Sequence, residues 1–399
     1  MSKDPANRIQ DYQVFGEFGG VNPSITDSAT FTFMNAEGMK RLFKEEVEGC
    51  FLYSRHMNPM LSFLSSALAA LENTEAAQVM GSGMGAISTT LMQLCAAGDE
   101  IISSRTIYGG SYALMKNFLP RFDVNTHFVN IVDLEQVKSK INDNTKVIYC
   151  ETISNPLLEV ADIRELRKIC DKHDIKLVVD NTFCPMCITP HDLGAHVVVN
   201  SLTKFINGTN DSVGGAVCGD KEFIKSLRAV TDGAAMLLGP TMDSLRASSV
   251  LKNMRTLHLR MKQHSKNAMY IAEYLEKLGI KIFYPGLKSH PQHGLAKSMI
   301  NDDYGYSGMI TIDVKEEILA QELMIRMQEK RVGYFAVSLG FYRTLFSSPG
   351  SSTSSEIPEE EQREMGMTPG LVRFSMGIDH DPERSLDRIV NCLREIQVL

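Results

Sequence analysis

A lysine stands directly after an apolar run near the middle of the chain, in the stretch AHVVVNSLTKFINGTNDS. The valines predict a buried strand, and a buried ammonium group is costly, so Lys204 either reaches solvent or lends its amine to chemistry in the interior. Burial would lower the pKa of this amine and make it a nucleophile toward an aldehyde. The residues that end the neighbouring strands decide between these alternatives.

Three other strand-like runs also end in polar or turn-forming residues. Together with the residues before the lysine, these ends carry Gly83 and Met84, Asn155, Asp180, and Ser201 and Thr203. Singly, each has an ordinary explanation, since a strand-end aspartate usually caps a helix or turn. The carboxyl ends of parallel strands share one edge of a sheet, however, and ligands bind there. The sequence therefore predicts one site that contains all of them.

Pyridoxal phosphate (PLP) is the ligand that suits this combination of groups. The glycine turn GSGMG at a helix start, with the hydroxyls of Ser201 and Thr203, suits a phosphate. Asp180 could pair with the ring nitrogen, and Lys204 could bond the aldehyde.

The elements that must position these residues follow from the apolar pattern. Between residues 58 and 256, continuous Val/Ile runs alternate with helical patterns, which predicts an α/β domain with a mostly parallel, doubly wound sheet. Residues 1–57 lack a core of their own and predict an extended arm. Residues 257–399 combine a long amphipathic helix with shorter strands, which predicts a smaller C-terminal α/β domain.

Composition excludes several other classes of protein. The formal net charge of -7 offers no basic face to nucleic acid or anionic lipid, and no apolar run is long enough to span a membrane. The first ten residues lack the apolar core of a secretory signal, so a cytoplasmic location is expected. Eight cysteines are too few for a disulfide scaffold, and the one CxxC pair, Cys184 and Cys187, has no partner set for a metal, so no metal is expected.

Six stretches resemble, in matching order, motifs of the Cys/Met-metabolism (trans-sulfuration) family of PLP-dependent enzymes. They are GSGMGAI, TIYGG, ETISNPLLEVADI, VVDNTF, NSLTKFINGTND and GLVRFSMGI. The resemblance implies PLP fold type I (aspartate-aminotransferase-like), with an N-terminal arm, a cofactor domain and a C-terminal domain. It also implies a homotetramer built from two active dimers.

The resemblance implies a role for each matching residue. Lys204 would form the Schiff base with the cofactor and move protons, Asp180 would keep the ring nitrogen protonated, and Tyr108 would stack on the ring and act as acid or base. The phosphate would be held by Gly83, Met84, Ser201 and Thr203, and by Tyr53 and Arg55 of the neighbouring subunit's arm. Asn155, Ser338 and Arg373 would orient cofactor and substrate, with Arg373 binding the α-carboxylate.

Two positions bear on the choice of reaction within the family. Val337, before Ser338, stands where cystathionine γ-lyases usually carry a glutamate, and resembles methionine γ-lyases. Gly110, two residues after Tyr108, departs from the cysteine typical of methionine γ-lyases. The resemblance favours elimination of a thiol from a sulfur amino acid, first methionine or homocysteine and also cystathionine or cysteine, to give a 2-oxo acid and ammonia.

Other functions remain open alternatives. Within the family, the alternative is γ-replacement on an O-acylhomoserine, as in sulfhydrylases and cystathionine γ-synthases. From another class, Gly81, Gly83 and Ala86 fit the G-x-G-x-x-A turn of an NAD-dependent oxidoreductase, but no acidic residue closes the next strand, and Lys204 and Asp180 stay unexplained.

Overall fold

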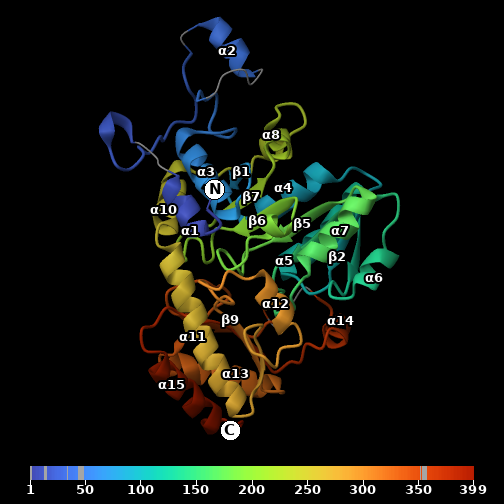
Figure 1. Ribbon diagram of the computed structural model, residues 1–399, viewed down its shortest axis with the longest axis vertical. Helices are drawn as coiled ribbons and strands as arrows, with labels where there is room; N and C mark the ends of the chain where they lie inside the picture. The colour runs from blue at the N-terminus through green and yellow to red at the C-terminus, as the bar shows by residue number, and fades with distance from the viewer. Residues whose placement is uncertain (1, 13–15, 34, 44–48, 351, 353–356) are drawn as a thin grey trace.

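A computed structural model describes residues 2–12, 16–33, 35–43, 49–350, 352 and 357–399, which two β-sheets organise (Figure 1). The larger sheet has the strand order β1-β7-β6-β5-β4-β2-β3. Its strands are β1 (Ala76–Met80), β2 (Glu100–Ser104), β3 (Asn125–Val129), β4 (Thr145–Glu151), β5 (Lys176–Asp180), β6 (Val197–Ser201) and β7 (Gly215–Gly219). β7 is antiparallel to both neighbours and the other pairs are parallel, which confirms the prediction of a mostly parallel sheet.

Helices cover both faces of this sheet. Successive strand residues point to opposite sides, and because both sets are apolar, each face must be buried. Ile102 and Ile148 belong to one apolar core, whereas their neighbours Ile101 and Val147 belong to the other. The first core includes residues of α3 (Pro59–Glu72), α6 (Leu134–Ser139), α7 (Ile163–His173) and α10 (Ser244–Met254). The second includes residues of α4 (Gly83–Leu94), α5 (Gly109–Ala113), α8 (Lys221–Arg228) and α9 (Ala234–Leu238). The sheet is therefore doubly wound.

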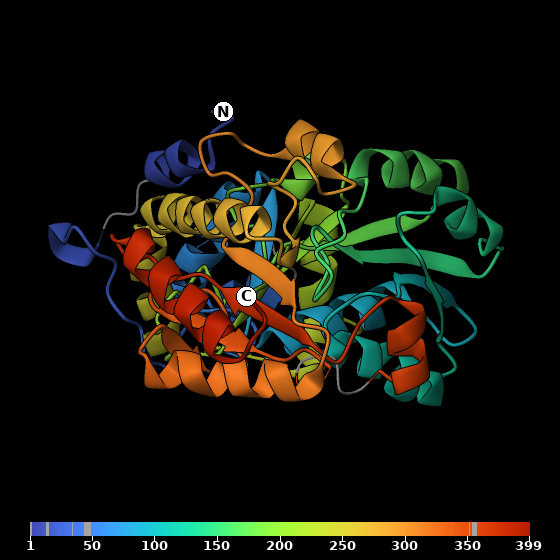
Figure 2. The same ribbon diagram turned by 90° about the horizontal axis from the view of Figure 1, so that it is seen from below.

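The smaller sheet has the order β10-β11-β12-β9-β8. Its strands are β8 (Lys281–Phe283), β9 (Met309–Asp313), β10 (Gly333–Phe335), β11 (Thr344–Ser347) and β12 (Leu371–Ser375). α11 (Leu257–Lys277), α13 (Glu317–Glu329) and α15 (Pro382–Glu395) pack over one face of it (Figure 2). Val372 and Phe374 point into that core, so the alternating residue Arg373 points to the opposite face. Two short helices, α12 (His293–Met299) and α14 (Glu359–Glu364), complete this part.

The N-terminal residues contain two helices with different surroundings. α1 (Pro5–Asp11) is fixed to the end of α3, because the buried Arg8 guanidinium donates to the carbonyls of Ala70 and Leu71 at 2.7 and 2.8 Å. α2 (Ala36–Phe43) stands away from the rest of the chain (Figure 1). In the described ranges, no helix combines the length and the apolar character needed to cross a bilayer.

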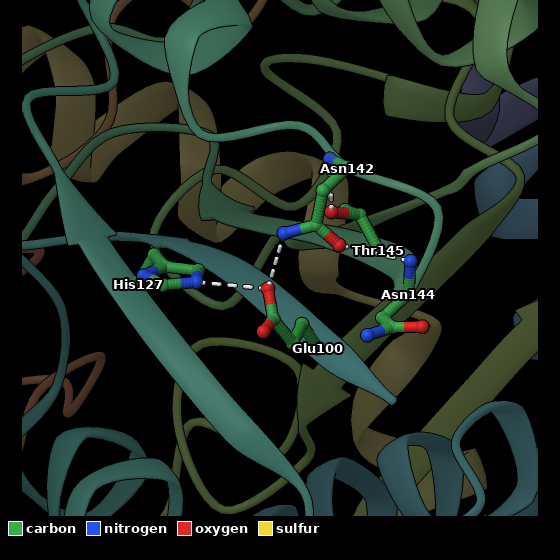
Figure 3. Close-up of polar contacts among 5 residues, drawn as sticks. All are labelled: Glu100, His127, Asn142, Asn144 and Thr145. Carbon is green, nitrogen blue, oxygen red and sulfur yellow. Dashed lines mark hydrogen bonds and ion pairs between the residues drawn. The ribbon is translucent and has the colours of Figure 1, made fainter. Parts of the chain in front are cut away.

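A polar cluster fixes the start of three parallel strands (Figure 3). Glu100, the first residue of β2, accepts hydrogen bonds from His127 of β3 at 2.8 Å and from the Asn142 amide at 2.7 Å. The loop before β4 is held by the Asn142 side chain, which accepts from the Asn144 N–H at 2.8 Å. These bonds hold β2, β3 and β4 together near their amino ends, opposite the carboxyl ends of the strands.

Candidate active site

A cavity of about 360 Å³ lies at the carboxyl ends of the parallel strands, where ligands bind in open α/β sheets. Most of the residues that the sequence singled out line it. These are Gly83, Met84, Tyr108, Asn155, Asp180, Ser201, Thr203, Lys204, Val337, Ser338 and Arg373. Tyr53 and Arg55 are not among its lining residues. The segments that meet here include the turn before α4, the loop after β2, the ends of β4, β5 and β6, the loop after β10, and β12.

One end of the cavity suits a phosphate group. Ser82 caps α4 by accepting from the Gly85 N–H at 2.9 Å, which leaves other N–H groups of the first turn free of intrahelical partners. A Cβ atom on Gly83 would lie 2.9 Å from the Ser201 Cβ, so glycine lets the Ser201 hydroxyl approach this turn. N–H groups at a helix start, with hydroxyls of Ser201 and Thr203 nearby, are donors suited to an anion.

Asp180 is a buried carboxylate with neutral hydrogen-bond donors. Its side chain accepts from the Thr182 N–H at 2.9 Å and from the Tyr149 hydroxyl at 3.3 Å, and the residue is 8% exposed. Burial raises the pKa of this carboxyl group, and the hydrogen bonds from Thr182 oppose the shift. A protonated ring nitrogen would supply the positive charge that such a group lacks. This end of the cavity therefore fits the pyridine ring of PLP.

Lys204 is half-buried and donates from Nζ to the Ser338 hydroxyl at 3.3 Å. Burial, together with the positive charge of Arg373, lowers the pKa of its amine to about 8. The neutral form, which attacks an aldehyde, is therefore far more populated near physiological pH than in an ordinary lysine, although the charged form still predominates. The lysine therefore does not simply reach solvent at the end of its strand.

Arg373 reaches the cavity from the smaller sheet. Its guanidinium donates to Asn155 Oδ1 at 2.8 Å and to Ser347 Oγ at 3.4 Å, and the residue is 3% exposed. Burial lowers its pKa to about 10, which leaves it charged at neutral pH. A buried guanidinium held by neutral acceptors suits the carboxylate of an amino acid.

Glu151, the last residue of β4, is a site residue that the sequence analysis missed. Its Oε1 accepts from the Tyr108 N–H and its Oε2 from the Asn155 N–H, both at 2.8 Å. The pKa of Glu151 is raised to about 8. Burial is the largest cause, and the negative charge of nearby Asp180 is the second. One carboxyl group thus joins the backbone of Tyr108 to that of Asn155. The available signal was its position at the end of VIYCE, the apolar run that leads to Asn155.

Tyr108 and Gly110 are in close contact. The Tyr108 side chain is 43% exposed at the mouth of the cavity. A Cβ atom on Gly110 would lie 2.6 Å from Tyr108 Cε1 and 3.2 Å from the Met84 sulfur. Any side chain at position 110 would therefore displace the tyrosine ring from its present place.

Tyr53 and Arg55 lie outside the cavity of their own chain. Tyr53 is 43% exposed, and the Arg55 guanidinium carbon lies 5.7 Å from the centre of its ring. The cations that line the cavity are Lys204 and Arg373, and neither belongs to the turn that begins α4. Among the described residues, no group of three or more His, Cys, Asp or Glu side chains could hold a metal ion.

This fold and cavity define the class as a PLP-dependent enzyme of fold type I. The family model for Cys/Met metabolism PLP-dependent enzymes matches residues 8–386, and the chain belongs to that family.

Several relatives cover nearly the whole chain. A methionine gamma-lyase from Arabidopsis thaliana is 46% identical over 381 residues, which are 94% of this chain and 86% of the relative. A cystathionine gamma-lyase from Bacillus subtilis is 36% identical, over 86% of this chain and 89% of its own length. The crystal structure of a putative O-acetylhomoserine (thiol)-lyase from Campylobacter jejuni, which contains a pyridoxyl-lysine phosphate, superposes with a TM-score of 0.90 at 26% identity, covering 98% of this chain and all of that one.

Proposed function

We propose that this PLP-dependent carbon–sulfur lyase eliminates a thiol from methionine or homocysteine and, with one molecule of water, gives a 2-oxo acid and ammonia. The observation that carries the choice of substrate is Val337, an apolar side chain that lines the cavity beside Ser338. Within the described part of the chain, the carboxyl groups that line the cavity are those of Glu151 and Asp180, and both already accept hydrogen bonds. Among the described residues that line the cavity, the distal ammonium group of cystathionine would find no free acidic partner, whereas a thioether tail gains from an apolar wall.

The proposal assigns the cofactor's groups to residues of the cavity. The first turn of α4, with Gly83 and Met84, would hold the phosphate together with Ser201 and Thr203. Asp180 would pair with the ring nitrogen, and Lys204 would bond the aldehyde carbon. When bound, PLP supplies an electron-withdrawing ring that stabilises negative charge on the substrate's α-carbon.

The remaining steps are assigned to protein groups. Arg373 binds the α-carboxylate of the substrate, and Asn155 holds the guanidinium in place through the 2.8 Å hydrogen bond. The Lys204 amine would be released when the substrate's amino group takes its place at the aldehyde carbon. Its pKa of about 8 suits it to remove the proton from the α-carbon and to return protons to the chain of the substrate. The Tyr108 hydroxyl gives a proton to the sulfur that leaves. Ser338 orients the Lys204 amine by accepting from it.

We also propose a cytoplasmic homotetramer built from dimers that share active sites. Tyr53 and Arg55 would complete the phosphate site of the neighbouring subunit, since they do not line the cavity of their own chain. Leu237, Leu238 and Leu245 are each more than half exposed, as expected for residues that another copy covers. The eight cysteines are all free, which suits a reducing compartment.

Product analysis of the purified holoenzyme tests the reaction. Methionine, homocysteine, cystathionine and cysteine are supplied in turn, and 2-oxobutyrate and pyruvate are quantified; O-acetylhomoserine is supplied with a thiol. We expect 2-oxobutyrate from methionine and homocysteine at a higher kcat/KM than any product from cystathionine, and no product from a Lys204→Ala variant. Pyruvate from cystathionine with methionine inert, or faster replacement on O-acetylhomoserine, would contradict the proposed reaction.

A further inference from the structure

A second hollow of about 300 Å³ lies in the C-terminal part of the chain and is lined by four arginines. Arg331 follows α13, Arg343 precedes β11, and Arg384 and Arg388 belong to the first turns of α15. We call this hollow the arginine pocket. Its other lining residues are Val332, Asp379, His380, Asp381 and Ser385. None of these residues lines the active-site cavity.

The two aspartates of the arginine pocket do not neutralise its arginines. Asp381 accepts from the backbone N–H of Arg384 at 3.0 Å, and Asp379 accepts from the Ser385 hydroxyl at 3.4 Å. Arg388 donates to the carbonyl oxygen of Arg331 at 3.2 Å. Throughout the described ranges, none of the four guanidinium groups forms an ion pair with a carboxylate.

The placement of these arginines is electrostatically unfavourable without an anion. Arg384 and Arg388 are four residues apart on one helix, a spacing at which like charges repel. Arg384 also lies in the first turn of α15, where the helix dipole favours negative charge. The whole chain nevertheless carries a net charge of -7, so this local excess of positive charge runs against its composition. Guanidinium groups bind phosphate oxygens through paired N–H donors, and pockets of this volume hold small ligands.

The arginine pocket is connected to the active site through one segment. Arg331 and Arg343 mark the two ends of residues 331–343, which include β10. The middle of the same segment supplies Val337, Ser338 and Leu339 to the active-site cavity. Arg343 also donates to the Tyr334 hydroxyl at 3.1 Å, which joins one end of the segment to β10. An anion that binds Arg331 and Arg343 together would therefore hold both ends of the segment that presents Val337 and Ser338.

We propose that the arginine pocket binds a phosphate-bearing small molecule, and that the bound anion clamps the ends of residues 331–343 and so restrains Val337 and Ser338. Binding is measured by calorimetry on the holoenzyme with inorganic phosphate and, separately, with ribose 5-phosphate, at constant ionic strength. We expect one site per chain, and the tighter of the two probes identifies free or esterified phosphate as the source. An unchanged visible spectrum of the cofactor verifies that the probe has not displaced it.

A double variant, Arg384→Gln with Arg388→Gln, is expected to weaken binding at least tenfold. Arg394→Gln, which removes an exposed arginine from the other end of α15, is the matched control and is expected to bind as the wild type does. If the double variant does not fold, as judged by its melting curve, Arg331→Gln gives the same test from another element. Equal binding by the variants and the wild type, or no binding of either probe, would overturn the site.

The clamp is tested by hydrogen exchange of the backbone amides of residues 336–340. We expect exchange there to slow several-fold when the probe binds the wild-type holoenzyme, and to stay unchanged in the double variant at the same probe concentration. Binding without any slowing would overturn the clamp.

Discussion

Burial sets the protonation of the ionisable groups in the active-site cavity. Desolvation is the largest cause in each case: it lowers the pKa of the Lys204 amine and raises the pKa values of Asp180 and Glu151. The same low-polarity surroundings therefore favour a neutral amine and make unpaired carboxylates costly. Bound PLP would supply an aldehyde for the Lys204 amine and a protonatable ring nitrogen for the Asp180 carboxyl group.

At the residue scale, the first prediction concerns Glu151. Glu151→Gln replaces one accepting oxygen with an NH₂ group that faces the N–H of Tyr108 or of Asn155. Leaving a buried donor unsatisfied costs about 1–3 kcal/mol, so we expect kcat/KM for methionine to fall roughly tenfold to a hundredfold. Steady-state kinetics measure the loss, and the visible absorbance of the cofactor shows whether it is retained. Glu135→Gln, at an exposed position on α6, is the control; activity equal to that of the control would contradict the positioning role.

The second prediction concerns Val337. Val337→Glu offers the distal ammonium group of cystathionine a negative partner, and Val337→Gln adds similar volume without the charge. We expect the glutamate variant to shift the ratio of kcat/KM values toward cystathionine by about tenfold to a hundredfold, and the glutamine variant to shift it much less. Equal shifts in the two variants would show that volume rather than charge decides the preference.

Sequence reasoning found the residues whose side chains carry unusual chemistry and missed one that acts on the backbone. Lys204 and Asp180 stood out because charged residues seldom end buried strands. Glu151 ends such a strand too, but its carboxylate receives two backbone N–H groups whose positions depend on how the loops around Tyr108 and Asn155 fold. The roles of the individual residues stay predictions that the variants above test.

At the scale of elements, the apolar pattern predicted a mostly parallel sheet because strands buried on both faces are apolar at every position. It did not indicate β7, whose sequence GAVCG lacks a run of Val and Ile. That strand lies between β1 and β6 and runs against both. A short strand with glycine at both ends is specified by its neighbours more than by its own residues.

The third prediction concerns the polar cluster at the start of β2. Hydrogen bonds from Asn142 and His127 lower the pKa of Glu100, so the folded chain favours its charged form. The stabilisation is therefore complete above the unfolded pKa, roughly 4.3, and is lost as the pH falls through the lower folded value. We expect Glu100→Gln to lower stability by about 1 kcal/mol at pH 7, with a smaller difference from wild type near pH 4.

Chemical denaturation at both pH values measures that difference. Glu135→Gln again serves as the control, because the side chain of Glu135 is 82% exposed in its ion pair with Lys138 and should contribute little at either pH. A difference for Glu100→Gln that stays constant with pH would contradict the assignment of the effect to the carboxylate's charge.

At the scale of the whole molecule, the cavity of a single chain lacks the two arm residues that the resemblance assigns to each phosphate site from the neighbouring subunit. Tyr53 and Arg55 lie outside the cavity, and the boundaries at residues 57/58 and 256/257 stay predictions. The apolar pattern of the sequence does not specify which copy the arm contacts, and the assignment of Tyr53 and Arg55 to the neighbouring subunit comes from the family resemblance alone. The two sheets, in contrast, follow from apolar patterns that each part of the chain carries itself.

The fourth prediction is that inactive variants complement each other. Arg55→Ala damages the site that the arm reaches, and Lys204→Ala damages the site of its own chain. A hybrid dimer of the two would contain one intact site, so we expect up to about half of the wild-type activity per hybrid once subunits exchange. Native mass spectrometry verifies the exchange. Hybrids that form without recovering activity would show that the arm serves its own subunit.

The close packing of Gly110 against the Tyr108 ring limits how this lineage can change. A codon substitution that introduces cysteine at position 110 would place a Cβ atom 2.6 Å from the ring, so the new side chain and the tyrosine cannot both keep favourable positions. The cysteine would therefore require the half-exposed Tyr108 ring to take another position. A change at position 110 would thus alter the placement of the proposed acid, Tyr108, without touching the cofactor or the substrate itself.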